Sequence, residues 1–430
     1  MKINGILLVQ PRFPLPGKSM NHKDYFPIGL LKIGSYFLNI EKNSNVMLVY
    51  GAEEKEKIVQ KIGFPKKIFI ASIFTYWAEY CYDALDYYTK LFPESEFIFG
   101  GIYASLMKDK IKERCQNNYP RIDFKLRTGL FKEAEEANLE YGPEISLLAD
   151  HKKIDYLVVH SMRGCPRRCK FCGTYIIEPE RLSWNGEIFE KYIRMVKTRY
   201  PQIKKLVFYD NNFLDNPYCK EILQVLIKLR EEKLIKNCES QSGFDGRFLN
   251  KELATLIKKA GFIYPKIAWD TMYNDKPNIK KQIDMLINAG YKGKEISVFM
   301  IYNWKIPFKE MIKKIKACCD WKVQITDCRY RPLYLDKLDG YNPHKYYGQE
   351  NGEYYISPEW TDFEVRIFRK IVRKGNIMTR MNWDNKQYFQ WMQKEKISKK
   401  SAGSSSKFIT EDIKVFKKIH KEKIRDPRLS

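Results

Sequence analysis

The sequence predicts an α/β protein in which two successive sets of parallel strands are followed by a helical C-terminal extension. Two observations carry this prediction. Short apolar runs alternate with helix-like stretches near the start of the chain, and the same alternation resumes after about residue 155. Strand–helix alternation is typical of a parallel sheet whose faces are covered by helices. At 430 residues the chain also exceeds one ordinary domain, so two or three domains are expected.

The first set of strands is expected in residues 1–140. Its apolar runs are residues 3–10, 45–51, 67–74 and 96–101, and residues 105–150 read as a connector. Open parallel sheets bind ligands beyond the carboxyl ends of their strands. The ligand-binding candidates at these ends are Ser72, Thr75, Gly100, Gly101 and Ser105. The two glycines would let a backbone approach a bulky ligand, although they could equally serve a tight turn.

The second set of strands is expected in residues 141–335. The candidate strands are residues 155–161, 205–210, 238–243, 266–270, 295–302 and 323–330, with helix-like segments between them. Six strand–helix units at this spacing suggest a barrel or part-barrel. In such barrels the chemistry lies at the carboxyl ends of the strands, so the loop after the first strand faces the expected site.

The pattern changes near residue 336. Residues 336–400 read as a loop followed by helices at 363–374 and 385–396, and residues 401–430 as a basic tail that starts with a flexible SAGSSS linker. The whole chain carries 77 Lys and Arg against 52 Asp and Glu, a net charge of +25. Because the excess is mostly Lys and is spread along the chain, solvated helix faces explain it better than nucleic-acid binding does.

The chain shows no sign of a membrane span or of secretion. No run of eighteen apolar residues occurs, and the apolar N-terminal run is followed by Pro11, Arg12 and Pro14 instead of a small-residue cleavage site. The ten cysteines are scattered, and Cys318 and Cys319 are adjacent, which does not suit a disulfide framework. We therefore expect a cytoplasmic protein.

Three of the ten cysteines, Cys165, Cys169 and Cys172, fall within eight residues on the loop after the first strand of the second set. A structural zinc site usually takes four ligands in two pairs, and no second pair lies nearby. A redox Cys-x2-Cys pair would leave Cys165 unexplained. Three thiolates instead suit an iron–sulfur cluster with one iron left open to a small molecule.

The spacing Cys165-x3-Cys169-x2-Cys172, after the first strand of a strand–helix barrel, resembles the radical S-adenosylmethionine (SAM) enzymes. Phe171 matches the aromatic residue that packs near the adenine in that motif. Further segments are similar to the class of this superfamily with an N-terminal cobalamin-binding-like domain: 100–106, 141–148, 163–174, 209–214, 244–262 and 330–333. The resemblance implies a Rossmann-like cobalamin-binding-like domain at 1–140 and a radical SAM (β/α)6 partial TIM barrel at 141–335.

The resemblance also implies a function. A [4Fe–4S] cluster on the three cysteines would cleave SAM reductively and generate a 5′-deoxyadenosyl radical that acts on an unknown substrate. With cobalamin bound, methyl transfer would be the expected outcome. The residues expected to contact SAM are Phe171, Asp210, Asn211, Ser240, Gln241, Arg247 and Asp270. Asn212, which follows the same strand as Asp210 and Asn211, is a further candidate. Arg247 could pair either with the methionine carboxylate of SAM or with Asp245.

The resemblance implies binding partners, and this sequence departs from the usual cobalamin pattern at one point. The basic residues Arg163, Arg167, Arg168 and Lys170 around the cysteines would suit an acidic electron donor such as flavodoxin or ferredoxin. The five strand-end residues of the first set are the cobalamin candidates. The Asp-x-His-x-x-Gly pattern that supplies a cobalt ligand in many cobalamin proteins is absent, so any cobalamin is expected to lack a histidine ligand from the loop after the first strand.

Two other functions stay open at this point. A methylthiotransferase-like enzyme acting on transfer RNA would fit the charge, but those enzymes place a second cluster on three front-domain cysteines, and this chain has only Cys81 and Cys115 there. A non-catalytic iron–sulfur protein that binds nucleic acid through its basic tail is the other. Iron content separates the first from a one-cluster enzyme, and SAM cleavage would exclude the second.

Overall fold

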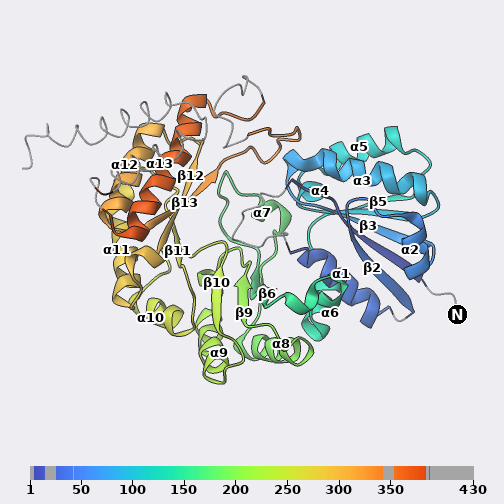
Figure 1. The fold of residues 1–430 in the computed structure, drawn as a ribbon, viewed down its shortest axis with the longest axis horizontal. Coiled ribbons are helices and arrows are strands. Elements are labelled where there is room, and N and C mark those ends of the chain that lie inside the picture. Colours follow the sequence, from blue (N-terminus) through green and yellow to red (C-terminus); the bar gives the residue numbers. More distant parts are fainter. Residues whose placement is uncertain (1–3, 15–25, 42, 342–352, 384–386, 388–430) are drawn as a thin grey trace, which may run out of the picture. The chain divides into compact units, whose positions relative to one another are not determined.

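The computed structural model describes residues 4–14, 26–41, 43–341, 353–383 and 387 (Figure 1). The chain divides into two compact units. The first contains the chain up to Ala268 together with Pro277–Lys292 and Tyr330–Tyr355, and the second contains Trp269–Lys276, Gly293–Arg329 and the chain from Ile356 onward. The domain boundary predicted near residue 140 lies inside the first unit and stays a prediction.

The first unit opens with a five-stranded parallel sheet in the order β2-β1-β3-β4-β5. Its strands are β1 (Asn4–Gln10), β2 (Ser44–Tyr50), β3 (Pro65–Ser72), β4 (Glu96–Gly101) and β5 (Phe124–Arg127). The first four match the predicted apolar runs. Strand β5 lies in the segment predicted to be a connector. It is hard to predict because this edge strand has only four residues and every second residue is exposed.

Helices cover both faces of this sheet, as the alternation predicted (Figure 1). They are α1 (Ile28–Asn39), α2 (Lys55–Ile62), α3 (Ala78–Leu91), α4 (Ile102–Leu106), α5 (Lys108–Asn118) and α6 (Lys132–Tyr141). Leu7 and Val9 of β1 face the core under α2, α3 and α5, whereas Ile6 and Leu8 face the core under α1. Side chains alternate between the faces of a strand, so one strand serves both cores.

The first unit continues with a second parallel sheet in the order β10-β9-β6. The strands of this region are β6 (Tyr156–Val159), β9 (Lys205–Phe208), β10 (Asn237–Ser240) and β11 (Lys266–Ala268), and the short pair β7 (Met162–Arg163) and β8 (Leu182–Ser183) is antiparallel. Isolated parallel bridges join Cys238 of β10 to Phe262 and, after β10, Phe244 to Ile267.

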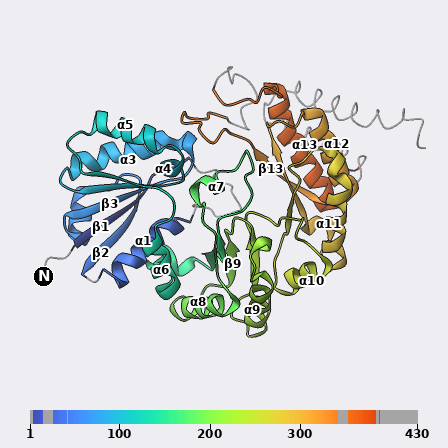
Figure 2. The same cartoon turned by 180° about the vertical axis from the view of Figure 1, so that it is seen from behind.

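Helices alternate with these strands. They are α7 (Thr174–Ile177), α8 (Gly186–Arg199), α9 (Cys219–Glu231), α10 (Lys251–Lys259) and α11 (Lys276–Asn288). Helices α8 and α9 lie side by side in both views (Figures 1 and 2). The Asn185 and Asn250 side chains cap α8 and α10 by accepting backbone N–H groups at 2.9 and 2.8 Å.

The second unit contains the parallel strands β12 (Ser297–Tyr302) and β13 (Gln324–Arg329) with helices α12 (Phe308–Asp320) and α13 (Asp362–Met381). A capping box between Thr361 and Glu364 starts α13, which confirms the helix predicted at 363–374. The helix predicted at 385–396 and the basic tail at 401–430 lie outside the described residues. The remaining short elements are 3-10 turns at Thr75–Trp77, Ile145–Leu147, His151–Lys153, Phe213–Asp215, Tyr273–Asp275 and Gly293–Glu295.

The predicted fold class, α/β with two successive sets of parallel strands, is confirmed. Within the described part of the chain, no helix combines the length and the apolar character that a membrane span requires.

Candidate metal centre

The three motif cysteines lie on one loop at the carboxyl end of β6, between the short strands β7 and β8. The Cys172 N–H donates to the Cys169 carbonyl at 3.0 Å, so the last two cysteines share a tight turn. Helix α7 begins two residues after Cys172. All three cysteines are half-buried, which leaves them accessible to a bound group from one side.

Asn211, which follows β9, holds this loop from both sides. Its Oδ1 accepts the Gly164 N–H at 3.0 Å, and its Nδ2 donates to Thr174 Oγ1 at 3.2 Å. Thr174 Oγ1 also accepts the Cys172 thiol hydrogen at 3.2 Å. The SAM contact expected of Asn211 stays a prediction, and within the protein its amide bonds the residue before Cys165 and the second residue after Cys172.

Asp210 joins the ends of two neighbouring strands. Its carboxylate accepts the backbone N–H of Ser161 at 3.0 Å and the Ser161 hydroxyl at 2.6 Å. Only 1% of Asp210 is exposed. Burial raises the pKa of Asp210 to about 6, and the hydrogen bonds from Ser161 oppose that shift. The SAM contact expected of Asp210 likewise stays a prediction, and within the protein its oxygens tie the end of β9 to the end of β6.

A polar group centred on Asn212 and Asp245 lies beside Cys165. The Asn212 Nδ2 is 4.0 Å from the Cys165 sulfur and 3.4 Å from Asp245 Oδ2, and Arg167 Nη2 donates to the same Asp245 oxygen at 3.2 Å. Asn212 is only 6% exposed, and its Oδ1 is buried without a hydrogen-bond partner. Because an unpaired buried acceptor costs free energy, a ligand donor beside Cys165 would satisfy this oxygen.

Arg247 pairs with Asp245, one of its two expected partners. The guanidinium donates to both carboxylate oxygens, with Nε–Oδ1 and Nη2–Oδ2 distances of 2.6 and 2.8 Å. Burial alone would raise the pKa of Asp245, but Arg247 and Arg167 outweigh burial and hold the pKa below its ordinary value. Asp245 is therefore a carboxylate next to the cysteine loop. Sequence reasoning named it only as a partner for Arg247, because its link to Arg167 joins residues 78 positions apart.

Four further residues are expected to contact SAM: Ser240, Gln241, Phe171 and Asp270. Ser240 Oγ donates to the Gly243 carbonyl at 2.9 Å, and Gln241 Nε2 donates to Glu239 at 2.9 Å, so both are engaged near their own turn. Phe171 lies half-buried on the cysteine loop. Asp270 belongs to the second compact unit.

Of the seven cysteines outside the motif, six have a thiol pKa above its ordinary value, and the seventh, Cys328, is exposed. Burial raises the pKa of the thiols of Cys81, Cys115, Cys219, Cys238, Cys318 and Cys319. A thiolate is the form that binds metal, and burial in apolar surroundings disfavours it. Within the described ranges, no three His, Cys, Asp or Glu side chains form a group that could hold a single metal ion. The chemistry of the donor set, three half-buried thiols on one loop, fits an iron–sulfur cluster.

At the carboxyl edge of the front sheet, the cobalamin candidates use many of their polar groups within the protein. Ser72 Oγ donates to the Gly100 carbonyl at 2.7 Å and accepts the Ala104 N–H at 3.1 Å. Gly101 has a φ of +105°, and a Cβ there would lie 2.1 Å from the Ser72 carbonyl oxygen, so packing between β3 and β4 requires a glycine. Thr75 is buried. These features need no ligand to explain them.

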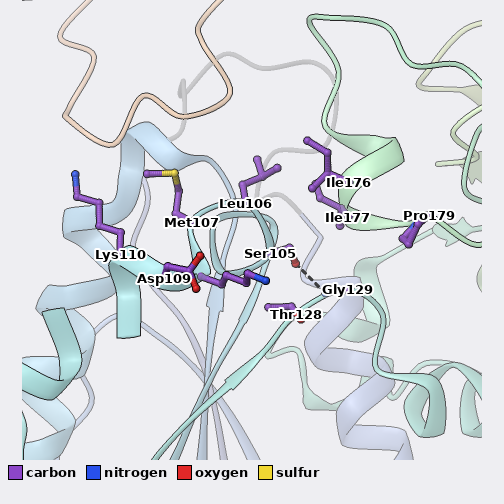
Figure 3. A pocket seen from close by; sticks show the side chains of 11 residues that line it. Ser105, Leu106, Met107, Asp109, Lys110, Thr128, Gly129, Ile176, Ile177 and Pro179 are labelled. Carbon is purple, nitrogen blue, oxygen red and sulfur yellow. Dashed lines mark hydrogen bonds between the residues drawn. The ribbon is translucent and has the colours of Figure 1, made fainter. Parts of the chain in front are cut away.

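Ser105 differs, because it lines a cavity of about 590 Å³ (Figure 3). Its hydroxyl donates to the Gly101 carbonyl at 2.8 Å and accepts the Gly129 N–H at 2.9 Å. The cavity lies between α4 and α5, the end of β5 and α7, and its apolar lining residues are Leu106, Met107, Ile176, Ile177 and Pro179. A Cβ on Gly173 would lie 3.4 Å from the Leu106 side chain, so the cavity wall packs against the residue that follows Cys172.

A strand–helix repeat that carries three thiols at the carboxyl end of its first strand is the arrangement of the radical SAM class. Residues 159–320 match the family model of the Radical SAM superfamily, so the chain contains a radical SAM domain and the resemblance stated above is confirmed. A search of curated proteins found no match to this chain.

Solved structures share this fold at low sequence identity. One is the radical SAM methyltransferase TsrM from Kitasatospora setae, solved with cobalamin and a [4Fe–4S] cluster, with 11% identity, a TM-score of 0.57 and 78% of each chain covered. Another is the cobalamin-dependent SAM radical enzyme OxsB, solved with aqua-cobalamin and SAM, with 14% identity and a TM-score of 0.50, over 74% of this chain and 52% of that chain. At these identities the likeness establishes the fold alone.

The buried Asp210 generates a prediction about pH. Because its folded pKa, about 6, lies above the ordinary 3.8, its contribution to stability is full below about pH 4 and is lost as the pH rises through about 6. Asp210→Asn should therefore gain stability relative to the native chain between pH 4 and pH 7, by about 1–3 kcal/mol. Urea unfolding at several pH values measures this difference.

Asp215→Asn is the matched control, since Asp215 lies in the same β9–α9 connection and pairs with Arg181 at 2.6 Å near the surface. Its effect on the unfolding free energy should change much less between pH 4 and pH 7. Parallel pH profiles for the native chain and Asp210→Asn would contradict the assigned environment of Asp210.

Proposed function

We propose that this chain is a radical SAM enzyme in which Cys165, Cys169 and Cys172 hold a [4Fe–4S] cluster. The observation that carries the proposal is the loop of three half-buried thiols at the carboxyl end of β6, inside the domain that matches the superfamily. When bound and reduced, the cluster supplies the electron that cleaves SAM to methionine and a 5′-deoxyadenosyl radical, which abstracts a hydrogen atom from the substrate.

The protein's part is to fix the thiols and to bind SAM beside them. Asn211 bonds both flanks of the cysteine loop and limits its motion. Asn212 offers an unsatisfied buried oxygen next to Cys165, and Asp245 adds a carboxylate 3.4 Å from the same amide. An ammonium group is the donor that this pair would bind best, and the methionine end of SAM carries one.

A second part of the proposal concerns cobalamin, which both similar enzymes contain in their solved structures. The cavity beside Ser105 lies at the carboxyl edge of the front sheet, where this kind of fold binds ligands. Pro11, Arg12 and Phe13 follow β1 directly, and none of these three described residues is a histidine that could bind cobalt. If cobalamin binds, methyl transfer is the reaction that we propose. We propose that one edge of the cobalamin lies in this cavity.

A methylthiotransferase-like function finds less support. Cys81 and Cys115 are both buried in the core of the front sheet, with thiol pKa values raised by burial. Neither is suited to hold a second cluster.

The partner we propose is an acidic electron donor, because Arg168 and Lys170 are exposed on either side of Cys169.

Iron content tests the cluster directly. Changing Cys165, Cys169 and Cys172 together to Ala should remove the iron and the broad visible absorbance of the anaerobically reconstituted protein, from about four irons per chain to nearly none. Cys319→Ala, which removes another half-buried cysteine, should keep both. A triple variant that retains its iron would show that the ligands lie elsewhere.

Asn212 provides a test of the SAM site. Asn212→Ala should weaken SAM binding about tenfold in anaerobic calorimetry, since one hydrogen bond to a charged group is worth about 1.5–3 kcal/mol. Asn237→Ala is the control, because Asn237 Oδ1 is also buried and unpaired but stands at the opposite end of a barrel strand, where β10 begins. Equal losses in both variants would argue against the assigned SAM position.

Cobalamin binding can be measured by gel filtration of the reconstituted protein with hydroxocobalamin. We expect absorbance from cobalamin to elute with the native chain and to fall strongly in Thr128→Trp, which narrows the cavity at the carboxyl end of β5. Asp123→Trp places the same side chain just before the other end of β5, so cobalamin should elute with this variant as it does with the native chain. If cobalamin elutes free while the cluster stays bound, the methyl-transfer proposal is wrong.

A further inference from the structure

A buried chain of charged side chains connects the front sheet's helices to the cysteine loop. It consists of Lys32 on α1, Glu135 on α6, Arg163 on β7 and Glu178 directly after α7. We call these four residues the charge relay. Their side chains are between 3% and 18% exposed, so water screens them little.

The contacts run without a break from Lys32 to the residue before Cys165. Lys32 Nζ donates to Glu135 at 2.5 Å, and the other Glu135 oxygen lies 3.9 Å from the Arg163 guanidinium. Arg163 pairs with Glu178 through two hydrogen bonds of 3.0 and 2.5 Å. Glu178 then accepts the Gly164 N–H at 3.1 Å. Glu178 follows Cys172 in sequence, so Arg163 closes the loop across its base.

The surroundings of the charge relay are poorly solvated. Burial lowers the pKa of Lys32 and opposes its charge, while Glu135 favours the charged form. Next to it, His160 is only 7% exposed, and its Nδ1 has no hydrogen-bond partner. Burial, together with Arg163 and Lys32, holds the pKa of His160 well below its ordinary value. A charge in such surroundings acts over a longer range than one in water.

We propose that Lys32 and Glu135 are positioning residues that allow the front domain to set both the placement of the cysteine loop and the reduction potential of the group it holds. The inference rests on the proposed function and deepens it. Among the described ion pairs, removing Lys32 leaves Glu135 with Arg163 at 3.9 Å as its one counter-charge. Arg163 is then drawn toward Glu135 and away from Glu178, which loosens the base of the loop.

The two charges also act on the potential. Reduction of a cluster adds negative charge, so loss of a nearby buried cation makes reduction harder. Lys32→Met should therefore shift the midpoint potential to more negative values. Lys32→Met combined with Glu135→Gln removes one positive and one negative charge together, so the local net charge is unchanged and the potential should return toward that of the native chain. Lys32→Arg should rescue both effects.

Two measurements on the full chain test the inference. The first is a redox titration of the reconstituted protein, followed by electron paramagnetic resonance. The second is hydrogen exchange of residues 160–178 in the protein before reconstitution, where Lys32→Met should raise exchange severalfold and the double variant should raise it less. Lys197→Met is the control, since Lys197 is also buried, at 8% exposed against 3% for Lys32, but in the described contacts donates only to the carbonyl oxygens of Pro201 and Ile203, after the end of α8.

The outcomes separate the inference from the proposed function. A chain that binds no cluster overturns the proposed function, while hydrogen exchange still tests the charge relay. Unchanged exchange and unchanged potential in Lys32→Met would refute the positioning role. Equal changes in Lys32→Met and Lys197→Met would also refute it, since that result indicates general destabilisation.

Discussion

Gly164 is the residue on which the arrangement of the cysteine loop depends. It has a φ of +77°, and a Cβ there would lie 2.3 Å from the Glu180 carbonyl oxygen, so no other residue fits without a shift of the backbone. Its N–H is shared by two acceptors, Asn211 Oδ1 from the end of β9 and Glu178 Oε2 from the far side of the loop. One backbone group thus fixes the point at which the chain turns toward Cys165.

The rest of the site follows from that turn. Asp210 locks the end of β9 to the end of β6, which brings Asn211 and Asn212 to the loop. Asp245 then gathers Arg167, Arg247 and Asn212 beside Cys165. The charge relay extends the same support into the front sheet through Glu135 and Lys32. The loop is therefore supported by three separate parts of the first unit, as a site that holds reacting groups in fixed geometry requires.

The sequence was sufficient for the fold class and for the cysteine motif, because both depend on local patterns. Apolar runs of strand length identify most of the strands, and the cysteine spacing lies within eight residues. Strand β5 was not predicted, because four residues with alternating exposure form no apolar run. The polar strand ends were harder, since Asp210 and Asn211 bond Ser161 and Gly164, which lie almost fifty residues away, and no local pattern records those bonds. Their contact with SAM stays a prediction.

Contacts between distant segments explain what sequence reasoning missed. The Asn212–Asp245 group joins the ends of two different strands. The charge relay joins Lys32 to Glu135 across 103 positions of sequence and Glu135 to Arg163 across 28. No periodicity or motif records such pairings in a single sequence. Burial also separates the motif from most of the other cysteines, because it raises the thiol pKa of residues such as Cys81 and Cys238 but leaves the motif loop half open.

The central claim is that the three-thiol loop cleaves SAM by one-electron reduction. The most direct measurement is anaerobic incubation of the reconstituted, reduced protein with SAM, followed by chromatography and mass spectrometry of the products. The account predicts 5′-deoxyadenosine and methionine in equal amounts, dependent on reductant and lost in the triple cysteine variant. Formation of S-adenosylhomocysteine without deoxyadenosine, with every reductant tried and an intact cluster, would contradict it.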